Sequence, residues 1–298
     1  MRRGIMLRRI LLASAGAMAL SGAALAAEPA PVPPPAPPPP QWTGFYVGGN
    51  AGGTWSNNNS VTTVTGNGAS SPGFDPLGIA SAGLATTSVP VKIDGFIGGG
   101  QWGDNYQFAN RWVGGFESDF QGITGGNRTT TLFSQATADV AGVGFSTNQN
   151  LTASKRLDWL ATDRVRLGYL ITPTFLAYGT GGVAYGTTRA SVAIAQTVSP
   201  GFSSGASFGN FDKTLAGWTA GGGVEWLFYP NWSLKVEYLY YDLGHVNFTM
   251  SPLVNSVAGV PVTVGAGSAS TRFNGNIVRA GLNYHIDLSM LAPIFAHF

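Results

Sequence analysis

The sequence of 298 residues contains no cysteine. This absence excludes a disulfide framework, thiolate zinc sites, a cysteine nucleophile and a lipid anchor attached through cysteine. The compartment in which the protein works therefore has to be read from other features of the chain.

Charged residues are also few, at 10% of the chain, whereas soluble domains contain roughly 25%. A surface so poor in charge is suited to a solvent other than water. No segment beyond residue 26 has the run of about eighteen apolar residues that a transmembrane helix needs. If the chain spans a membrane, it must do so as a closed β-barrel, because open sheet edges cannot be satisfied in lipid.

The N-terminus has the pattern of a secretory signal peptide. Four arginines open the chain, an apolar run follows at residues 10–20, and Ala24-Leu25-Ala26 forms the cleavage site. The apolar run is too short to serve comfortably as a membrane anchor. Removal of residues 1–26 takes four of the sixteen basic residues and none of the fourteen acidic ones, which leaves a net charge of −2. We therefore expect no nucleic-acid partner.

Residues 27–40 are rich in proline, which donates no backbone hydrogen bond and cannot join a sheet. They are predicted to form a polyproline II spacer of about 3.1 Å per residue. This segment is expected to be a periplasmic linker, and a docking site for a periplasmic partner is the alternative. The barrel is predicted over residues 41–287, followed by a C-terminal tail at 288–298.

Strand-like segments rich in glycine and aromatic residues recur along the rest of the chain. Eight are predicted, at residues 42–55, 91–108, 111–122, 156–171, 175–189, 214–229, 233–244 and 274–286. Tight links at residues 109–110, 172–174 and 230–232 alternate with long polar links at residues 56–90, 123–155, 190–213 and 245–273. Short turns on one rim and long loops on the other are typical of an outer-membrane barrel.

The two faces of each segment differ in polarity. In residues 277–286 one parity is wholly apolar, whereas the other carries Arg279, Asn283 and His285. A soluble ligand-binding barrel, the weaker alternative, would instead hide an apolar interior behind a charged exterior. The sequence thus predicts an all-β, eight-stranded antiparallel up-and-down transmembrane barrel, with short periplasmic turns and four long extracellular loops.

Eight motifs resemble those of the small outer-membrane barrels of alphaproteobacteria described as porin family proteins or outer membrane immunogenic proteins, which are OmpA-like in shape. The resemblance implies a location in the outer membrane of a Gram-negative bacterium, with outer-membrane lipid and the barrel assembly machinery as partners. It implies no shared catalytic site. The matching motifs appear in family order at residues 42–49, 98–101, 115–119, 164–169, 178–186, 217–221, 235–240 and 278–284.

The C-terminal end departs from this family pattern. Family members end on an aromatic residue that closes the last strand and is read by the assembly machinery. Here Ile286 holds that place and residues 287–298 follow. The resemblance leaves Tyr284 and Phe298 as the two candidates for the assembly signal.

Other chemical motifs carry little weight. Residues 179–184 fit the spacing G-x-G-x-x-A, yet the helix and the acidic residue of a dinucleotide site are both missing. His245, His285 and His297 have no metal-ligand spacing, and no G-x-S-x-G nucleophile elbow is present. We predict no cofactor, no metal and no enzymatic activity.

The polar parity of the strands gathers equal numbers of acidic and basic residues. Charges that face a narrow interior are tolerable only when they are paired and hydrogen-bonded. One interpretation is a salt-bridged, largely closed lumen, with function in envelope structure and in surface interaction through the loops. The alternative is a small passive diffusion porin. The lumen residues are Glu117, Asp119, Arg164, Arg166, Glu225, Lys235, Glu237 and Arg279.

The remaining expectations concern partners. The long loops offer a place for an extracellular ligand, but their Ser, Asn and Gly content identifies none. The protein is expected to be a monomer or a weak homo-oligomer.

Overall fold

The computed structural model describes residues 42–66, 75–200, 203–257, 260–263 and 265–286. The predicted signal peptide (1–26), proline-rich linker (27–40) and C-terminal tail (288–298) lie outside the described residues. Within the described part of the chain, no helix is long and apolar enough to cross a bilayer.

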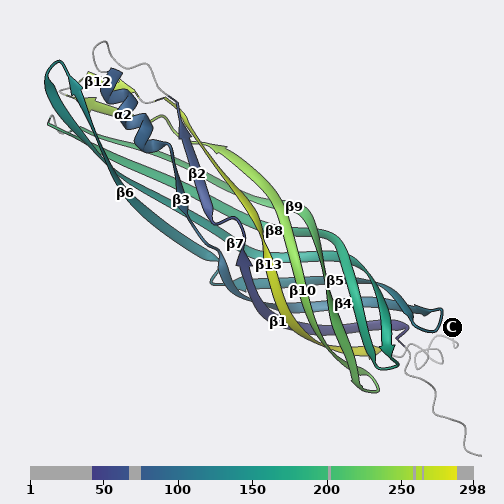
Figure 1. The fold of residues 1–298 in the computed structure, drawn as a ribbon. Coiled ribbons are helices and arrows are strands. Elements are labelled where there is room, and N and C mark those ends of the chain that lie inside the picture. The colour runs from purple at the N-terminus through teal and green to yellow at the C-terminus, as the bar shows by residue number, and fades with distance from the viewer. Residues whose placement is uncertain (1–41, 67–74, 201–202, 258–259, 264, 287–298) are drawn as a thin grey trace, which may run out of the picture. The chain divides into compact units, whose positions relative to one another are not determined.

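Eight strands form a closed antiparallel ring (Figure 1). Each pairs with its neighbours in the order β1-β4-β5-β7-β8-β9-β10-β13, and β13 pairs with β1 to close the ring. The predicted fold class is therefore confirmed. The strands are β1 (Gly44–Ser56), β4 (Asp94–Phe108), β5 (Trp112–Thr124), β7 (Val143–Thr172), β8 (Phe175–Ser199), β9 (Ser203–Tyr229), β10 (Trp232–Thr249) and β13 (Gly267–Ile286).

The three tight links lie where the sequence predicts them. Ala109 and Asn110 connect β4 to β5 with φ angles of 47° and 64°. Together with Arg111 they form a three-residue link between the paired residues Phe108 and Trp112, and their left-handed φ angles reverse the chain tightly. Residues 173–174 connect β7 to β8, and residues 230–231 connect β9 to β10.

The long links contain much more regular structure than their composition predicts. Residues 123–155 hold β6 (Asn127–Val140) and the first part of β7, while residues 190–213 hold the ends of β8 and β9. These strands extend well beyond their predicted bounds because Thr, Ser and Asn alternate with small apolar residues, a pattern that suits a half-buried strand. The other two links hold β2 (Ser60–Thr65), α2 (Asp75–Ala85), β3 (Thr87–Pro90), β11 (Val254–Val257) and β12 (Val260–Thr263).

The outward face of the ring is an apolar band between two sets of aromatic residues. Val165 and Leu167 are exposed by 66% and 53%, whereas their inward neighbours are buried. We call the outer girdle Trp159, Tyr185, Trp218 and Tyr240, and the inner girdle, beside the tight turns, Trp112, Tyr169, Trp232 and Tyr284.

The girdles also give the depth of the membrane. In β7, residues 159–169 run from one girdle to the other, and these eleven residues match the roughly 9–11 of a tilted transmembrane strand. Girdle residues contact one another across strands, with ring centroids 5.2 Å apart for Trp218 and Tyr240 and 5.3 Å apart for Trp112 and Tyr169. Such aromatic belts mark the membrane interfaces of outer-membrane barrels.

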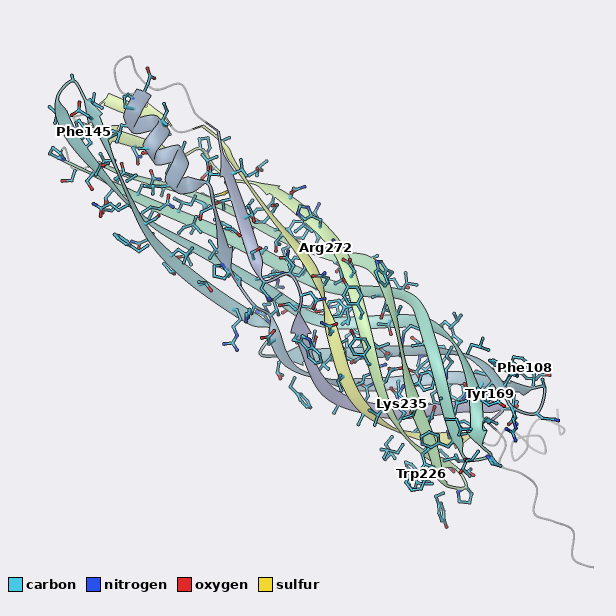
Figure 2. All side chains as sticks on the ribbon, viewed as in Figure 1. Phe108, Phe145, Tyr169, Trp226, Lys235 and Arg272 are labelled. Carbon is cyan, nitrogen blue, oxygen red and sulfur yellow. The ribbon has the colours of Figure 1, made fainter. Side chains whose placement is uncertain are left out.

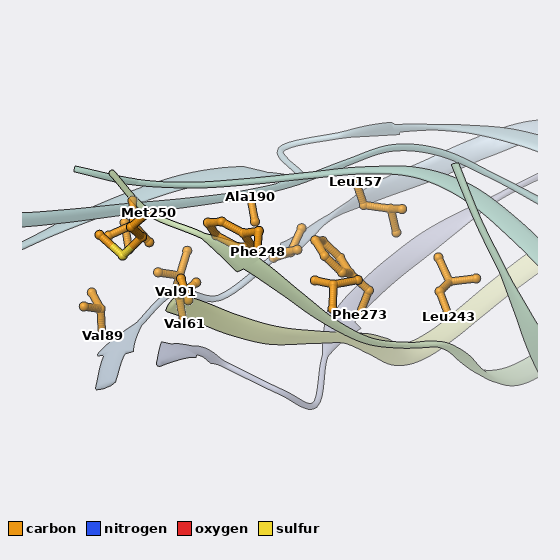
Figure 3. Packing of buried hydrophobic residues seen from close by; sticks show 14 of the residues in the cluster. Val61, Val89, Val91, Leu157, Ala190, Leu243, Phe248, Met250 and Phe273 are labelled. Carbon is orange, nitrogen blue, oxygen red and sulfur yellow. The ribbon is translucent and has the colours of Figure 1, made fainter. Parts of the chain in front are cut away.

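Beyond the outer girdle the wall divides. Pairing between β9 and β10 ends at Trp218 and Asp242. From there β9 continues with β8, β7 and β6, while β10 continues with β13, β2 and β3. One apolar cluster contains buried residues from both groups of strands (Figure 3). Its members include Val61, Val89, Leu157, Ala190, Phe248, Met250 and Phe273. We call these strands beyond the outer girdle, which are β2, β3, β6 and the outer parts of β7, β8, β9, β10 and β13, the outer portion. The outer portion thus has an apolar core of its own.

Candidate functional site

The eight predicted lumen residues come from five strands of the ring. They lie at inward positions because each stands between two outward, membrane-facing neighbours. All eight are buried, with at most 4% of their surface exposed. Figure 2 labels Lys235 of this set and, on the outer face, Trp226, which is 50% exposed. The structure brings the complete set into one network.

Arg164 lies at the centre of the network. Its Nη2 donates to Glu117 Oε1 at 2.5 Å and to Asp119 Oδ2 at 2.8 Å, and its Nη1 donates to Glu237 Oε1 at 2.9 Å. Arg279 joins two of the same carboxylates, with Nη2 2.8 Å from Asp119 Oδ2 and 2.5 Å from Glu237 Oε2. Two arginines and three carboxylates are therefore connected by hydrogen bonds inside the barrel.

Glu117 connects this group to the remaining cations. Lys235 Nζ donates to Glu117 Oε1 at 2.6 Å, and Arg166 Nη1 lies 3.4 Å from Oε2. The Tyr46 hydroxyl also donates to Oε2, at 2.6 Å. One carboxylate thus receives hydrogen bonds from four different side chains, counting that of Arg164.

Arg166 and Glu225 form the part of the network nearest the tight turns. Arg166 Nη2 lies 2.5 Å from Glu225 Oε2, and the guanidinium lies 4.2 Å from the centre of the Tyr178 ring. Ser233 Oγ and Asn283 Nδ2 donate to the other oxygen of Glu225 at 2.6 and 2.8 Å. Such pairing is needed to stabilise buried charges, since their desolvation costs several kcal/mol per ion.

Apolar side chains fill the lumen on both sides of the charges. Toward the tight turns, Trp42 packs in a buried cluster with Val113, Leu170, Leu176 and Leu227. Its indole Nε1 donates to the backbone oxygen of Pro173 at 3.0 Å. Toward the outer girdle, the inward positions hold fully buried Ile97, Leu160, Ala184, Leu239 and Ile277. The buried inward side chains thus form three layers along the barrel: apolar, charged and apolar.

Sequence reasoning missed these apolar layers and the two tyrosines. Ile277 shares the inward parity of Arg279, and Leu239 that of Glu237. Both were visible as apolar residues on the polar parity. Tyr46 likewise shares its parity with the buried Asn50. The signal that could have found these residues is a change between polar and apolar side chains along the inward face. A comparison of the whole inward face with the whole outward face hides this change.

Lys155 is a buried cation outside the predicted set and outside the membrane. It lies in β7 four residues before Trp159 and so beyond the outer girdle. Its Nζ donates to the backbone oxygens of Asn58 and Arg272 at 2.9 and 2.6 Å, and it lies 4.9 Å from the centre of the Phe273 ring. Burial lowers the pKa of Lys155 to about 8.

The structure shows where the glycine motif and the histidines lie. Residues 179–184 lie within β8, in the wall of the ring and paired on both sides. His285 Nε2 lies 2.9 Å from Ser233 Oγ, His245 is exposed, and His297 lies outside the described residues. Across the described ranges, no three His, Asp or Glu side chains are arranged to hold a metal ion.

Comparisons with known proteins agree with this architecture. The family model "Outer membrane protein beta-barrel domain" matches residues 12–285. Two proteins called "31 kDa outer-membrane immunogenic protein", from Brucella melitensis biotype 1 and Brucella suis biovar 1, are each 32% identical over 282 residues. Each alignment covers 93% of this chain and 99% of the relative.

Similar solved structures are outer-membrane proteins as well. OprG from Pseudomonas aeruginosa has a TM-score of 0.38 and 14% identity, and the alignment covers 82% of this chain and 97% of OprG. Neisserial surface protein A has a TM-score of 0.27 and 15% identity, with 82% and 98% covered. These TM-scores are low, so the fold is established by the strand pairing described above and not by the similarity to these structures.

Proposed function

The chain belongs to the outer-membrane protein β-barrel family, and from this premise we propose that it is a barrel with a largely closed lumen. It acts in envelope structure and, through its outer portion, in interaction at the cell surface. An outer-membrane location replaces the alternative of a soluble ligand-binding barrel.

The filled lumen is the observation that carries this proposal. An eight-stranded barrel is just wide enough for side chains to fill. A column of water or ions would have to pass the Trp42 layer, the charged network and the layer that contains Leu239 and Ile277. Opening the middle layer means separating buried ion pairs, and removal of one partner of such a pair costs about 3–5 kcal/mol. This favours a plug over a diffusion pore.

The lumen also offers no reactive group to a substrate. Each of its four carboxylates is engaged by at least one cation within 2.5–2.8 Å, and each is buried. A general acid or base needs access to the proton it transfers. We therefore propose a role that does not involve catalysis.

The outer portion supports the role in surface interaction. Its strands have their own apolar core and form a firm platform beyond the membrane. Two aromatic side chains on it are open to solvent, Phe133 on β6 at 66% and Phe208 on β9 at 69%. Exposed aromatic residues on a rigid surface are suited to contact an extracellular ligand.

Potassium efflux from vesicles tests the closed lumen. The purified protein is folded into vesicles loaded with potassium, and vesicles from a mock purification serve as the control. We expect equal efflux from both. In cells that lack the protein, the envelope should lose part of its barrier function, and expression of the parent chain should restore it. This result would support the role in envelope structure. Faster efflux from the protein vesicles, in proportion to the folded protein, would contradict the plug.

A further inference from the structure

Two arginines lie side by side on the outer face just beyond the outer girdle. Arg156 in β7 and Arg189 in β8 are direct cross-strand partners. Directly opposed residues of an antiparallel pair have Cβ atoms about 4.5–5.5 Å apart, and like charges at that distance destabilise the sheet. The side chains are nevertheless 47% and 48% exposed rather than turned away from each other into the protein.

Two carboxylates offset this repulsion. Asp158 forms ion pairs with both arginines, and Asp212 in β9 lies 2.9 Å from Arg189. A register shift next to Asp158 marks a β-bulge, a device that re-aims side chains. In all three ion pairs the nearest guanidinium atom is Nε. The terminal nitrogens of two adjacent guanidinium groups are therefore available to a further anion, and this fork geometry suits the oxygens of a phosphate.

The height of the pair indicates where that phosphate comes from. Arg156 lies three residues before Trp159, and Arg189 lies four residues after Tyr185. At about 3.3 Å per residue and a tilt near 40°, this places the arginines roughly 7–10 Å beyond the girdle. The polar headgroup region on each side of a bilayer is about 5–7 Å thick. Long arginine side chains reach back into this layer.

A groove adjoins the arginine pair at the place where β9 and β10 separate. It has a volume of about 630 Å³ and contains Phe211 and Phe248, with polar groups around them. Asp212, the partner of Arg189, also lines this groove. A pocket of this size, with an apolar surface and a few polar groups, suits a small ligand. The remaining polar lining residues are Asn210, Lys213, Asn247, Thr249 and Ser268.

We propose that this outer rim binds the phosphorylated sugar headgroup of an outer-leaflet glycolipid. Arg156 and Arg189 hold the phosphate, and the sugar lies over the groove between β9 and β10. The inference rests on the outer-membrane location and on a topology in which this rim faces the cell exterior, so it holds whether or not the lumen conducts.

Binding of lipid A to the folded full chain tests this proposal. The protein in detergent micelles is titrated with bisphosphorylated lipid A or its dephosphorylated form, and native mass spectrometry measures the bound fraction. The double variant Arg156→Gln/Arg189→Gln is expected to lose roughly thirtyfold in affinity, about a factor of five for each arginine near a membrane surface. Arg111→Gln, which removes a cation at the opposite rim, is the matched control and is expected to bind as the parent does.

A second variant separates binding from a structural role. Because the negative charge of Asp212 repels the phosphate that Arg189 attracts, Asp212→Asn is expected to strengthen binding severalfold, which a purely structural ion pair would not do. Equal binding of dephosphorylated lipid A, or no change in either variant, would overturn the proposal. So would inorganic phosphate that competes as effectively as the lipid, since the site would then be a general anion site.

Discussion

Replacement of Glu117 by glutamine tests the energetics of the lumen at its most connected residue. Glu117 accepts from Arg164 at 2.5 Å, from Lys235 at 2.6 Å and from Tyr46 at 2.6 Å. Arg164 keeps Asp119 and Glu237 as partners, but Lys235 has no other ion pair within the described ranges. The variant therefore leaves a buried ammonium without a carboxylate, which costs about 3–5 kcal/mol in a dry site.

Urea unfolding of the protein in lipid vesicles, followed by tryptophan fluorescence, measures this loss. Asp139→Asn removes an exposed carboxylate of β6, beyond the outer girdle, and is expected to change stability by about 0–1 kcal/mol. The double variant Glu117→Gln/Lys235→Met removes both charges and should recover most of the loss. If Glu117→Gln costs no more than Asp139→Asn, solvent screens the charges and the lumen contains water.

Three further predictions follow from the outward face and the outer portion. Val236→Arg, midway between the girdles, should destabilise the folded barrel by about 2–4 kcal/mol, with a smaller loss for Leu282→Arg near the inner girdle; equal folding of both variants and the parent, by heat-modifiable mobility, would refute the lipid-facing assignment. A membrane-impermeant maleimide should label Val143→Cys in intact cells but Thr172→Cys only after lysis, and the opposite result would invert the topology; the chain has no cysteine to interfere. Because the folded pKa of Lys155, about 8, lies below its unfolded value, the native state binds fewer protons between pH 8 and about 10.4. Stability should then rise with pH in this window by at most about 1.4 kcal/mol per unit, and an undiminished slope in Lys155→Met would assign it to another group.

The number of strands, the tight turns and the two faces could be predicted from the sequence because they depend on local patterns. Alternation of Val236 with Lys235 and Glu237 is enough to assign an inner and an outer side to β10. The resemblance to the outer membrane immunogenic proteins is confirmed by the family model and the Brucella relatives. Each strand, turn and motif depends on residues that are close together in the sequence.

The partners within the lumen could not be predicted, since they depend on the register of strands far apart in the chain. Glu117 and Lys235 are 118 positions apart, and only the stagger of the closed ring places them at one level. The outer portion could not be predicted from the sequence for a different reason. Its strands are as rich in Ser and Thr as loops are, and burial of Val192 and Ile194 depends on the facing strands β10, β13, β2 and β3, which local pattern does not reveal.

Single-channel recording of the purified parent protein in planar bilayers tests the closed lumen most directly. The account predicts no steady conductance above that of a mock preparation, because the Trp42 layer, the charged network and the Leu239 layer leave no continuous path. A reproducible open channel in the parent, whose ion selectivity shifts in Glu225→Ala or Glu237→Ala with little loss of stability, would contradict it.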